Sequence, residues 1–170
     1  MKRMNGSRGF TLIEILVVVA ILAILSSLLL GAVVAARTRA KNMAVQATLQ
    51  GLSAAIERYE GDFTDYPPSD GDSSGLLGAE NLYECLMTTS KSGPYITKPS
   101  DFPSVEGSRG KPMFCDAWNR PIRYWHHHDY GNKVPNKHTF RLISDGANGQ
   151  FENGDASSDD IVNWKKEKPE

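Results

Sequence analysis

Hydrophobic residues are concentrated in one nearly unbroken run from Phe10 to Ala36, which follows a short polar leader at residues 1–9. From residue 15 to residue 36, only Ser26, Ser27 and Gly31 are not plainly apolar. A helix of about 22 residues is about 33 Å long, which is enough to cross the hydrocarbon core of a bilayer. A secretory signal peptide has a shorter apolar region of roughly 7 to 15 residues. The pattern therefore predicts a membrane-spanning helix over residues 10–36 that stays with the protein.

The helical periodicity continues beyond Ala36, but it becomes amphipathic. Apolar residues recur at alternating spacings of four and three, at Val45, Leu49, Leu52, Ile56, Tyr59 and Phe63. This spacing predicts one continuous helix whose second half, residues 37–61, ends near Gly61. We expect its apolar stripe to pack on a sheet of the same domain, with an intermolecular coiled coil as the alternative.

The remaining residues, 62–170, predict one small domain of mixed structure. Residues 62–78 are rich in turn-forming residues, and a short helix follows with Leu76, Leu77, Leu82 and Leu86 as its buried positions. Residues 100–113 indicate a loop, residues 122–127 alternate as a half-buried strand does, residues 131–138 form a hairpin loop, and residues 139–144 form the returning strand. The predicted fold class is α+β, with a long amino-terminal helix packed on a small antiparallel sheet.

Composition limits the possible partners. The chain has 170 residues and a formal net charge of −1. Removal of the leader with Lys2, Arg3 and Arg8 would change the side-chain charge from −1 to −4. A mildly acidic protein of this kind is not expected to bind nucleic acid.

A single acidic residue, Glu14, lies just inside the apolar run. A carboxylate at membrane depth costs about 2.5 to 3.5 kcal/mol unless it reaches the interface or finds a partner. Glu14 is therefore a candidate functional residue, although a position among the lipid headgroups is also open.

The segment from Arg8 to Glu14, Arg-Gly-Phe-Thr-Leu-Ile-Glu, resembles the class III signal of type IV pilins and of the pseudopilins of type II secretion. The resemblance implies that a prepilin peptidase cuts between Gly9 and Phe10 and methylates the new amine of Phe10. It also implies that Glu14 acts in assembly. A buried acid with one compatible partner, the terminal amine of a neighbouring subunit, would set the register of the polymer.

Similarity to the major pseudopilin extends along most of the chain, including residues 116–124, where a tight turn before a strand is implied. It implies a structural subunit of the periplasmic pseudopilus, with no catalytic residues. The implied partners are copies of itself, minor pseudopilins, the prepilin peptidase/methyltransferase, and the inner-membrane assembly platform with its ATPase. Basic residues on both sides of the apolar run leave the orientation nearly tied. The resemblance implies a single-pass inner-membrane protein of bacteria, with its carboxyl-terminal domain in the periplasm.

Residues 144–164 are rich in Asp, Asn, Ser and Gly, whose oxygen atoms suit calcium rather than zinc. The spacing does not match an EF-hand, and a solvated acidic loop is the alternative. The two ends of this segment resemble the calcium-binding carboxyl-terminal region of the major pseudopilin. The implied ligands are Ser144, Asp145, Asn148, Asp159 and Asp160. Asn148 stands where the family has Asp, and Asp145 stands where the family offers a backbone carbonyl.

Two further groups of residues carry possible chemistry. Cys85 and Cys115 could form a disulfide in the periplasm or remain two free thiols. Of the three consecutive histidines, only His126 and His128 could share a metal ion if they lie on a strand, and an exposed strand end is the alternative.

Two other functions compete with the pseudopilin interpretation. One is a type IV pilin or minor pilin for adhesion, motility or DNA uptake, although such pilins more often carry a disulfide loop near their end. The other is a membrane-anchored hydrolase or metal sensor, but the sequence shows no recognisable Ser/His/Asp or Cys/His arrangement.

Overall fold

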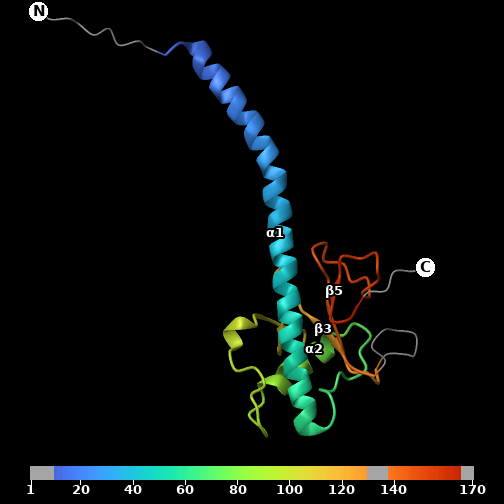
Figure 1. Cartoon of the computed structure of the whole chain (residues 1–170). Helices are drawn as coiled ribbons and strands as arrows, with labels where there is room; N and C mark the ends of the chain where they lie inside the picture. Colours follow the sequence, from blue (N-terminus) through green and yellow to red (C-terminus); the bar gives the residue numbers. More distant parts are fainter. Residues whose placement is uncertain (1–9, 130–137, 166–170) are drawn as a thin grey trace, which may run out of the picture. The chain divides into compact units, whose positions relative to one another are not determined.

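The computed structural model describes residues 10–129 and 138–165, which fall into two compact units, Met1–Arg39 and Ala40–Glu170. The predicted leader at residues 1–9 and nearly all of the predicted hairpin loop at residues 131–138 lie outside the described residues. Figure 1 shows the first unit as one stretch of helix and the second unit as a mixed domain. The described residues have the predicted α+β class, with a long first helix and small antiparallel sheets.

Helix α1 spans Leu12–Phe63 without a break, which confirms the single long helix. It ends two residues beyond the predicted Gly61. Thr64 stops it by adopting a left-handed conformation with φ of 62°, while its backbone N–H still donates to the Glu60 carbonyl at 2.7 Å.

The predicted apolar stripe of α1 is buried inside its own domain. Val45, Leu49, Leu52 and Ile56 are each at most 2% exposed, and Tyr59 and Phe63 pack at the edge of the same core. The stripe therefore packs within the domain, and the alternative of an intermolecular coiled coil at this face is wrong.

Helix α2 spans Leu76–Met87 where the short helix was predicted, and Figure 1 shows it near the carboxyl-terminal half of α1. The Asp72 carboxylate caps its first turn by accepting from the backbone N–H groups of Leu76 and Leu77 at 3.1 and 3.2 Å. Leu82 and Leu86 are buried as expected. Leu76 and Leu77 are only partly buried, because the face turned to the core in the first turn carries Gly78, Ala79 and Glu80 instead.

Two small antiparallel sheets complete the domain. Strands β1 (Ser104–Glu106) and β2 (Pro112–Phe114) pair after the short 3-10 helix η1 (Pro99–Asp101), so the loop predicted over residues 100–113 is wrong. Strands β3 (Arg123–Trp125), β4 (Arg141–Ser144) and β5 (Ile161–Val162) form the second sheet in the order β3-β4-β5.

Strand β3 is shorter than predicted, because the chain turns after Trp125 instead of continuing to residue 127. The implied tight turn before it is present, with Asn119 at a φ of 60°. Tyr124 faces Leu142 across the ladder, and both side chains are fully buried. The two sheets and α2 thus enclose one core with the apolar stripe of α1.

Candidate functional site

The first functional region is the amino-terminal end of α1, where Thr11 and Glu14 form a capping box. One Glu14 oxygen, Oε2, accepts hydrogen bonds from the backbone N–H of Thr11 at 2.9 Å and from the Thr11 hydroxyl at 3.0 Å. The Glu14 backbone N–H lies 3.4 Å from the same hydroxyl. This reciprocal arrangement satisfies N–H groups that a helix start leaves without partners. The second carboxylate oxygen, Oε1, has no hydrogen-bond partner among the described residues.

Of the two residues at the predicted cleavage site, the structure describes only Phe10. Phe10 is 82% exposed immediately before Thr11, whereas Gly9 lies outside the described residues. The Thr11-x-x-Glu14 spacing is a sequence signature of this capping box, which gives Glu14 a role beyond the assembly role that the family resemblance implies.

The part of α1 from residue 15 to residue 36 is almost entirely apolar, and its described side chains are uncovered. Ile15, Leu16 and Val19 are between 52% and 61% exposed, and the other large apolar side chains described in this unit are exposed as well. The helix is long and apolar enough to cross a membrane, with an 18-residue window of mean hydropathy 2.9. Such a surface calls for lipid or for other protein chains around it.

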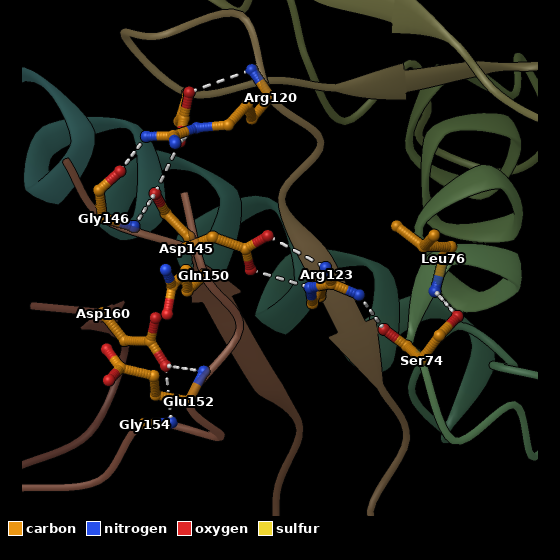
Figure 2. A network of polar contacts seen from close by, with 12 residues as sticks. Ser74, Leu76, Arg120, Arg123, Asp145, Gly146, Gln150, Glu152, Gly154 and Asp160 are labelled. Carbon is orange, nitrogen blue, oxygen red and sulfur yellow. Dashed lines mark hydrogen bonds and ion pairs between the residues drawn. The ribbon is translucent and has the colours of Figure 1, made fainter. Parts of the chain in front are cut away.

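The second functional region is the acidic segment between β4 and the end of β5. Glu152, Asp159 and Asp160 each place one carboxylate oxygen within 4.8 Å of the others. Asp160 is buried, and its Oδ2 accepts from the backbone N–H groups of Glu152 at 3.1 Å and Gly154 at 2.8 Å (Figure 2). Three carboxylates this close repel one another unless a proton or a cation joins them.

Asn148 lies beside these acids, as the sequence suggested. Its backbone N–H donates to Asp159 Oδ2 at 2.8 Å, and its amide nitrogen donates to Glu152 Oε2 at 3.2 Å. Gly146 makes the turn possible, because its φ is 62° and an added Cβ would lie 2.3 Å from the Asp159 carbonyl oxygen. Carboxylate oxygens on a compact loop are donors that calcium prefers, so the three acids fit that ion, whereas the Asn148 amide oxygen accepts from the Gln150 backbone N–H at 2.7 Å.

The structure does not bring the side chains of Ser144 and Asp145 into this group. Both oxygens of Asp145 accept from Arg123, with distances of 2.7 Å from Nε and 2.9 Å from Nη2 (Figure 2). The Ser144 hydroxyl donates to Asp116 Oδ2 at 2.7 Å. The negative charge of Asp145 is therefore already matched by Arg123 and does not offset the missing charge of Asn148.

Glu152 is the functional candidate that the sequence did not reveal. It lies in the middle of the segment, outside both stretches that resemble the major pseudopilin. Only the fold of the loop brings it to Asp159 and Asp160.

Of the two alternatives left open for the cysteines, the structure has two free thiols and not the possible disulfide between Cys85 and Cys115. The Cys85 thiol, on α2, interacts with the Tyr59 hydroxyl of α1, and burial raises its pKa. Cys115 is buried just after β2, where its backbone pairs with Pro121. The two residues thus have separate partners.

The histidine triplet also differs from its prediction. Since β3 ends at Trp125, residues 126–128 form a turn and do not alternate between two faces. Ligand atoms of His126, His127 and Asp65 lie close enough together to share an ion, so the limit to His126 and His128, which assumed a strand, does not hold.

Comparison with known proteins decides the family. Residues 4–36 match the prokaryotic N-terminal methylation motif. The chain is 30% identical to the type II secretion system core protein G of Vibrio cholerae, with 96% of each chain covered. It is 32% identical to the protein of the same name from Pseudomonas aeruginosa, with 92% of this chain and 94% of that protein covered. The chain belongs to the core protein G family of type II secretion systems, the major pseudopilins.

Similarity to a type IV pilin is more limited. The wide pilus major component PilA4 of Thermus thermophilus is 43% identical over 63 residues, which cover 37% of this chain and 48% of that protein. The core protein G family accounts for nearly the whole chain, so it is favoured over the pilin alternative. Its members are structural pseudopilins, which agrees with a non-enzymatic role.

Proposed function

We propose that this chain is the structural subunit of a periplasmic pseudopilus, which polymerises through the apolar half of α1 and drives protein export across the outer membrane. The observation that carries the proposal is the uncovered apolar surface of α1, headed by a single acid, in a member of the core protein G family. Stacking of these helices in a fibre would cover the apolar surface that lipid covers before assembly.

Processing of the leader prepares the end of this helix. A prepilin peptidase/methyltransferase cuts between Gly9 and Phe10 and methylates the amine of Phe10. The motif match across residues 4–36 supports this step, and the exposure of Phe10 leaves its surroundings open to an enzyme. The cut creates a positive charge one residue before the capping Thr11.

Glu14 then docks the incoming subunit. Oε2 holds the Thr11 hydrogen bonds, so the carboxylate has a fixed position at the helix start. Oε1 remains available for the Phe10 amine of a neighbouring subunit. An ion pair made in an apolar environment is much stronger than one in water, and it would accept only a neighbour in the correct register.

The place and partners of the subunit follow from the same role. Before assembly, residues 10–36 cross the bacterial inner membrane once, with the carboxyl-terminal domain in the periplasm. The assembly platform and its ATPase supply the work of extraction, and minor pseudopilins join the fibre. The long apolar helix and the family of the chain support this arrangement.

A calcium ion held by the acidic loop completes the proposed subunit. Glu152, Asp159 and Asp160 supply carboxylate oxygen donors, and the Asn148 amide would have to turn its oxygen, which accepts from the Gln150 backbone N–H, toward the ion to join them. The ion would neutralise the clustered carboxylates and fasten the loop between β4 and β5 to the sheet.

Mass spectrometry of the protein from native membranes tests the processing step. We expect a chain that begins at Phe10 and carries one additional methyl group on its amine. An intact residue 1, or a cut at another position, would remove the basis of the proposal.

The assembly step is tested by fibre yield. Glu14→Gln keeps an oxygen that can accept the Thr11 hydrogen bonds but removes the charge. We expect processed Glu14→Gln protein to accumulate in the membrane without fibres and without export. Normal fibres from this variant would contradict docking by the carboxylate.

A further inference from the structure

The three consecutive histidines are stacked in a single turn after β3. The ring centroids of His126 and His127 are 4.3 Å apart, and those of His127 and His128 are 3.9 Å apart. The turn closes through a hydrogen bond of 3.0 Å from the Asp129 backbone N–H to the His126 carbonyl. As a result, neighbouring imidazoles lie on the same side of the chain instead of pointing to opposite faces as they would in a strand.

A carboxylate from a distant part of the chain meets this stack. Asp65 follows the left-handed Thr64 that ends α1, and its Oδ1 lies 2.9 Å from His126 Nε2. One ligand atom each from Asp65, His126 and His127 lies within 4.8 Å of the other two. His126 is buried, whereas the Asp65 side chain is 62% exposed, so the group has one side in the protein and one side open to solvent.

A second observation, on His127, also points to a ligand at this group of residues. Its Nδ1 is buried and has no hydrogen-bond partner among the described residues. A buried nitrogen without a partner is costly, and native structures rarely leave one.

We propose that Asp65, His126 and His127 form a binding site for a divalent transition-metal ion of the zinc type. Two imidazole nitrogens and one carboxylate oxygen are a donor set that suits zinc and that leaves a coordination position for water or for His128. The donors differ in kind from the acidic loop, which offers only oxygen atoms and suits calcium. One domain would thus hold two ions of different chemistry at separate places.

Metal binding requires one local rearrangement. His126 Nδ1 now accepts a hydrogen bond of 3.2 Å from the His128 backbone N–H, which places the ring proton on Nε2 beside Asp65. When Nε2 binds the metal, the proton moves to Nδ1 and the His128 bond breaks. His128 lies in an exposed turn, so its backbone can move to allow this.

The site would connect two parts of the domain that the sequence separates by 61 residues. Asp65 belongs to the turn at the end of α1, and His126 belongs to the end of β3. An ion bound only by the folded protein stabilises it, so zinc would fasten the carboxyl-terminal end of α1 to the sheet.

The test uses the full chain in detergent without a polyhistidine tag. Zinc chloride is titrated in competition with a chromophoric chelator, and cobalt chloride is titrated separately while its visible absorption is recorded. We expect one zinc ion per chain with micromolar or tighter affinity. We also expect cobalt bands of the intensity that four or five nitrogen and oxygen ligands produce.

His127→Gln and Asp65→Asn should each weaken zinc binding at least tenfold, and both change side chains that are not fully buried. Asp159→Asn, in the acidic loop, is the matched control and should leave zinc affinity unchanged. Binding that is equally tight in His127→Gln and Asp65→Asn would overturn the proposal. Wild-type binding only in the millimolar range, or a cobalt spectrum like that of the aqueous ion, would overturn it without relying on any variant.

Discussion

The Glu14 carboxylate and the Thr11 residue three positions before it are joined by two hydrogen bonds that share one oxygen, at 2.9 and 3.0 Å. The acid that we propose docks the incoming subunit is thus also the residue that caps the helix in a single chain. These two roles can be separated, because capping needs a hydrogen-bond acceptor, whereas docking of an amine needs a negative charge.

Thr11→Val should reduce capping and leave docking intact. It removes the hydroxyl but keeps the backbone N–H bond and the Glu14 charge, so the expected loss is about 1 kcal/mol of helix stability at the first turn. We expect fibres at near-normal yield from Thr11→Val and none from Glu14→Gln, measured by sedimentation and electron microscopy. If Thr11→Val blocks assembly as completely as Glu14→Gln does, capping is the main function of Glu14.

Calcium should stabilise the domain through the acidic loop. At a calcium concentration one hundred times the Kd, the gain is about 2.7 kcal/mol, which corresponds to a rise in Tm of about 5 to 10 °C. Asp159→Asn combined with Asp160→Asn should abolish this rise, and Glu152→Gln should reduce it. Thermal unfolding of the full chain in detergent, with calcium and with a chelator, measures the effect.

Asp155 supplies the matched control for calcium binding. It is an exposed acid of the same loop that lies outside the group of three carboxylates. Asp155→Asn should leave the calcium-dependent rise in Tm unchanged. An equal loss of stability in chelator for the variants at Asp159 and Asp160 would mean that these residues act through the fold and not through an ion.

The elements that the sequence predicted correctly are those with long or strongly periodic patterns. The stripe from Val45 to Phe63 extends over several turns, so its helix and its buried face were both legible. Strands β1 and β2 have three residues each, which is too short for an alternating pattern to stand out from a loop. Strand β3 was predicted too long, because His126 and His127 continue its alternation in sequence while the backbone already turns.

The candidate sites were predictable only where they depend on local spacing. Glu14 and the loop acids Asp159 and Asp160 could be found from motifs. The contacts of Asp145 with Arg123 and of Asp65 with His126 join residues 22 and 61 positions apart, and they depend on how distant parts of the chain pack together. No periodicity in one sequence encodes such contacts, so the partner of each charge had to come from the structure.

A buried acid on α2 makes a further prediction possible. Glu80 is 1% exposed, and it accepts hydrogen bonds from the side chain of Arg109 and from the Arg109 backbone N–H, the latter at 3.1 Å. Burial alone would raise the pKa of Glu80, but the hydrogen bonds and charge of Arg109 lower it overall. Glu80 is therefore held as a carboxylate under the β1–β2 hairpin.

Arg109→Ala should destabilise the domain by about 3 kcal/mol, because it leaves that buried carboxylate without its cation. Lys111→Ala is the matched control from the same hairpin. The Lys111 ammonium lies 2.9 Å from the Glu84 carboxylate, but both side chains are exposed, so the loss of this ion pair should cost less than about 1 kcal/mol. Urea unfolding of both variants measures the difference, and equal effects would show that burial of Glu80 is not what makes the pair important.

The stability of the domain should also fall at high pH, because of two tyrosines at the end of α1 and the segment that packs on it. The Tyr95 hydroxyl donates to Asp62 Oδ2 at 2.7 Å, and burial together with this hydrogen bond raises the pKa of Tyr95 to about 12. Burial likewise raises the pKa of Tyr59 to about 12, and the two rings meet edge to face at 5.4 Å.

A raised pKa means that the folded protein holds the phenolic proton more tightly than the unfolded chain does. The stabilisation from Tyr59 and Tyr95 is therefore complete below pH 10 and is lost as the pH rises to about 12.

Tyr95→Phe should make the fall in the free energy of unfolding shallower over this range, because Phe has no proton to lose. Asp62→Asn leaves the Tyr95 hydroxyl in place but removes the negative charge beside it. This variant should therefore bring the pKa of Tyr95 closer to 10. Urea unfolding and phenolate absorbance of the wild type, Tyr95→Phe and Asp62→Asn, recorded between pH 10 and about pH 12, measure both effects. If the free energy of unfolding of Tyr95→Phe falls with pH as steeply as that of the wild type, the alkaline loss of stability comes from other groups.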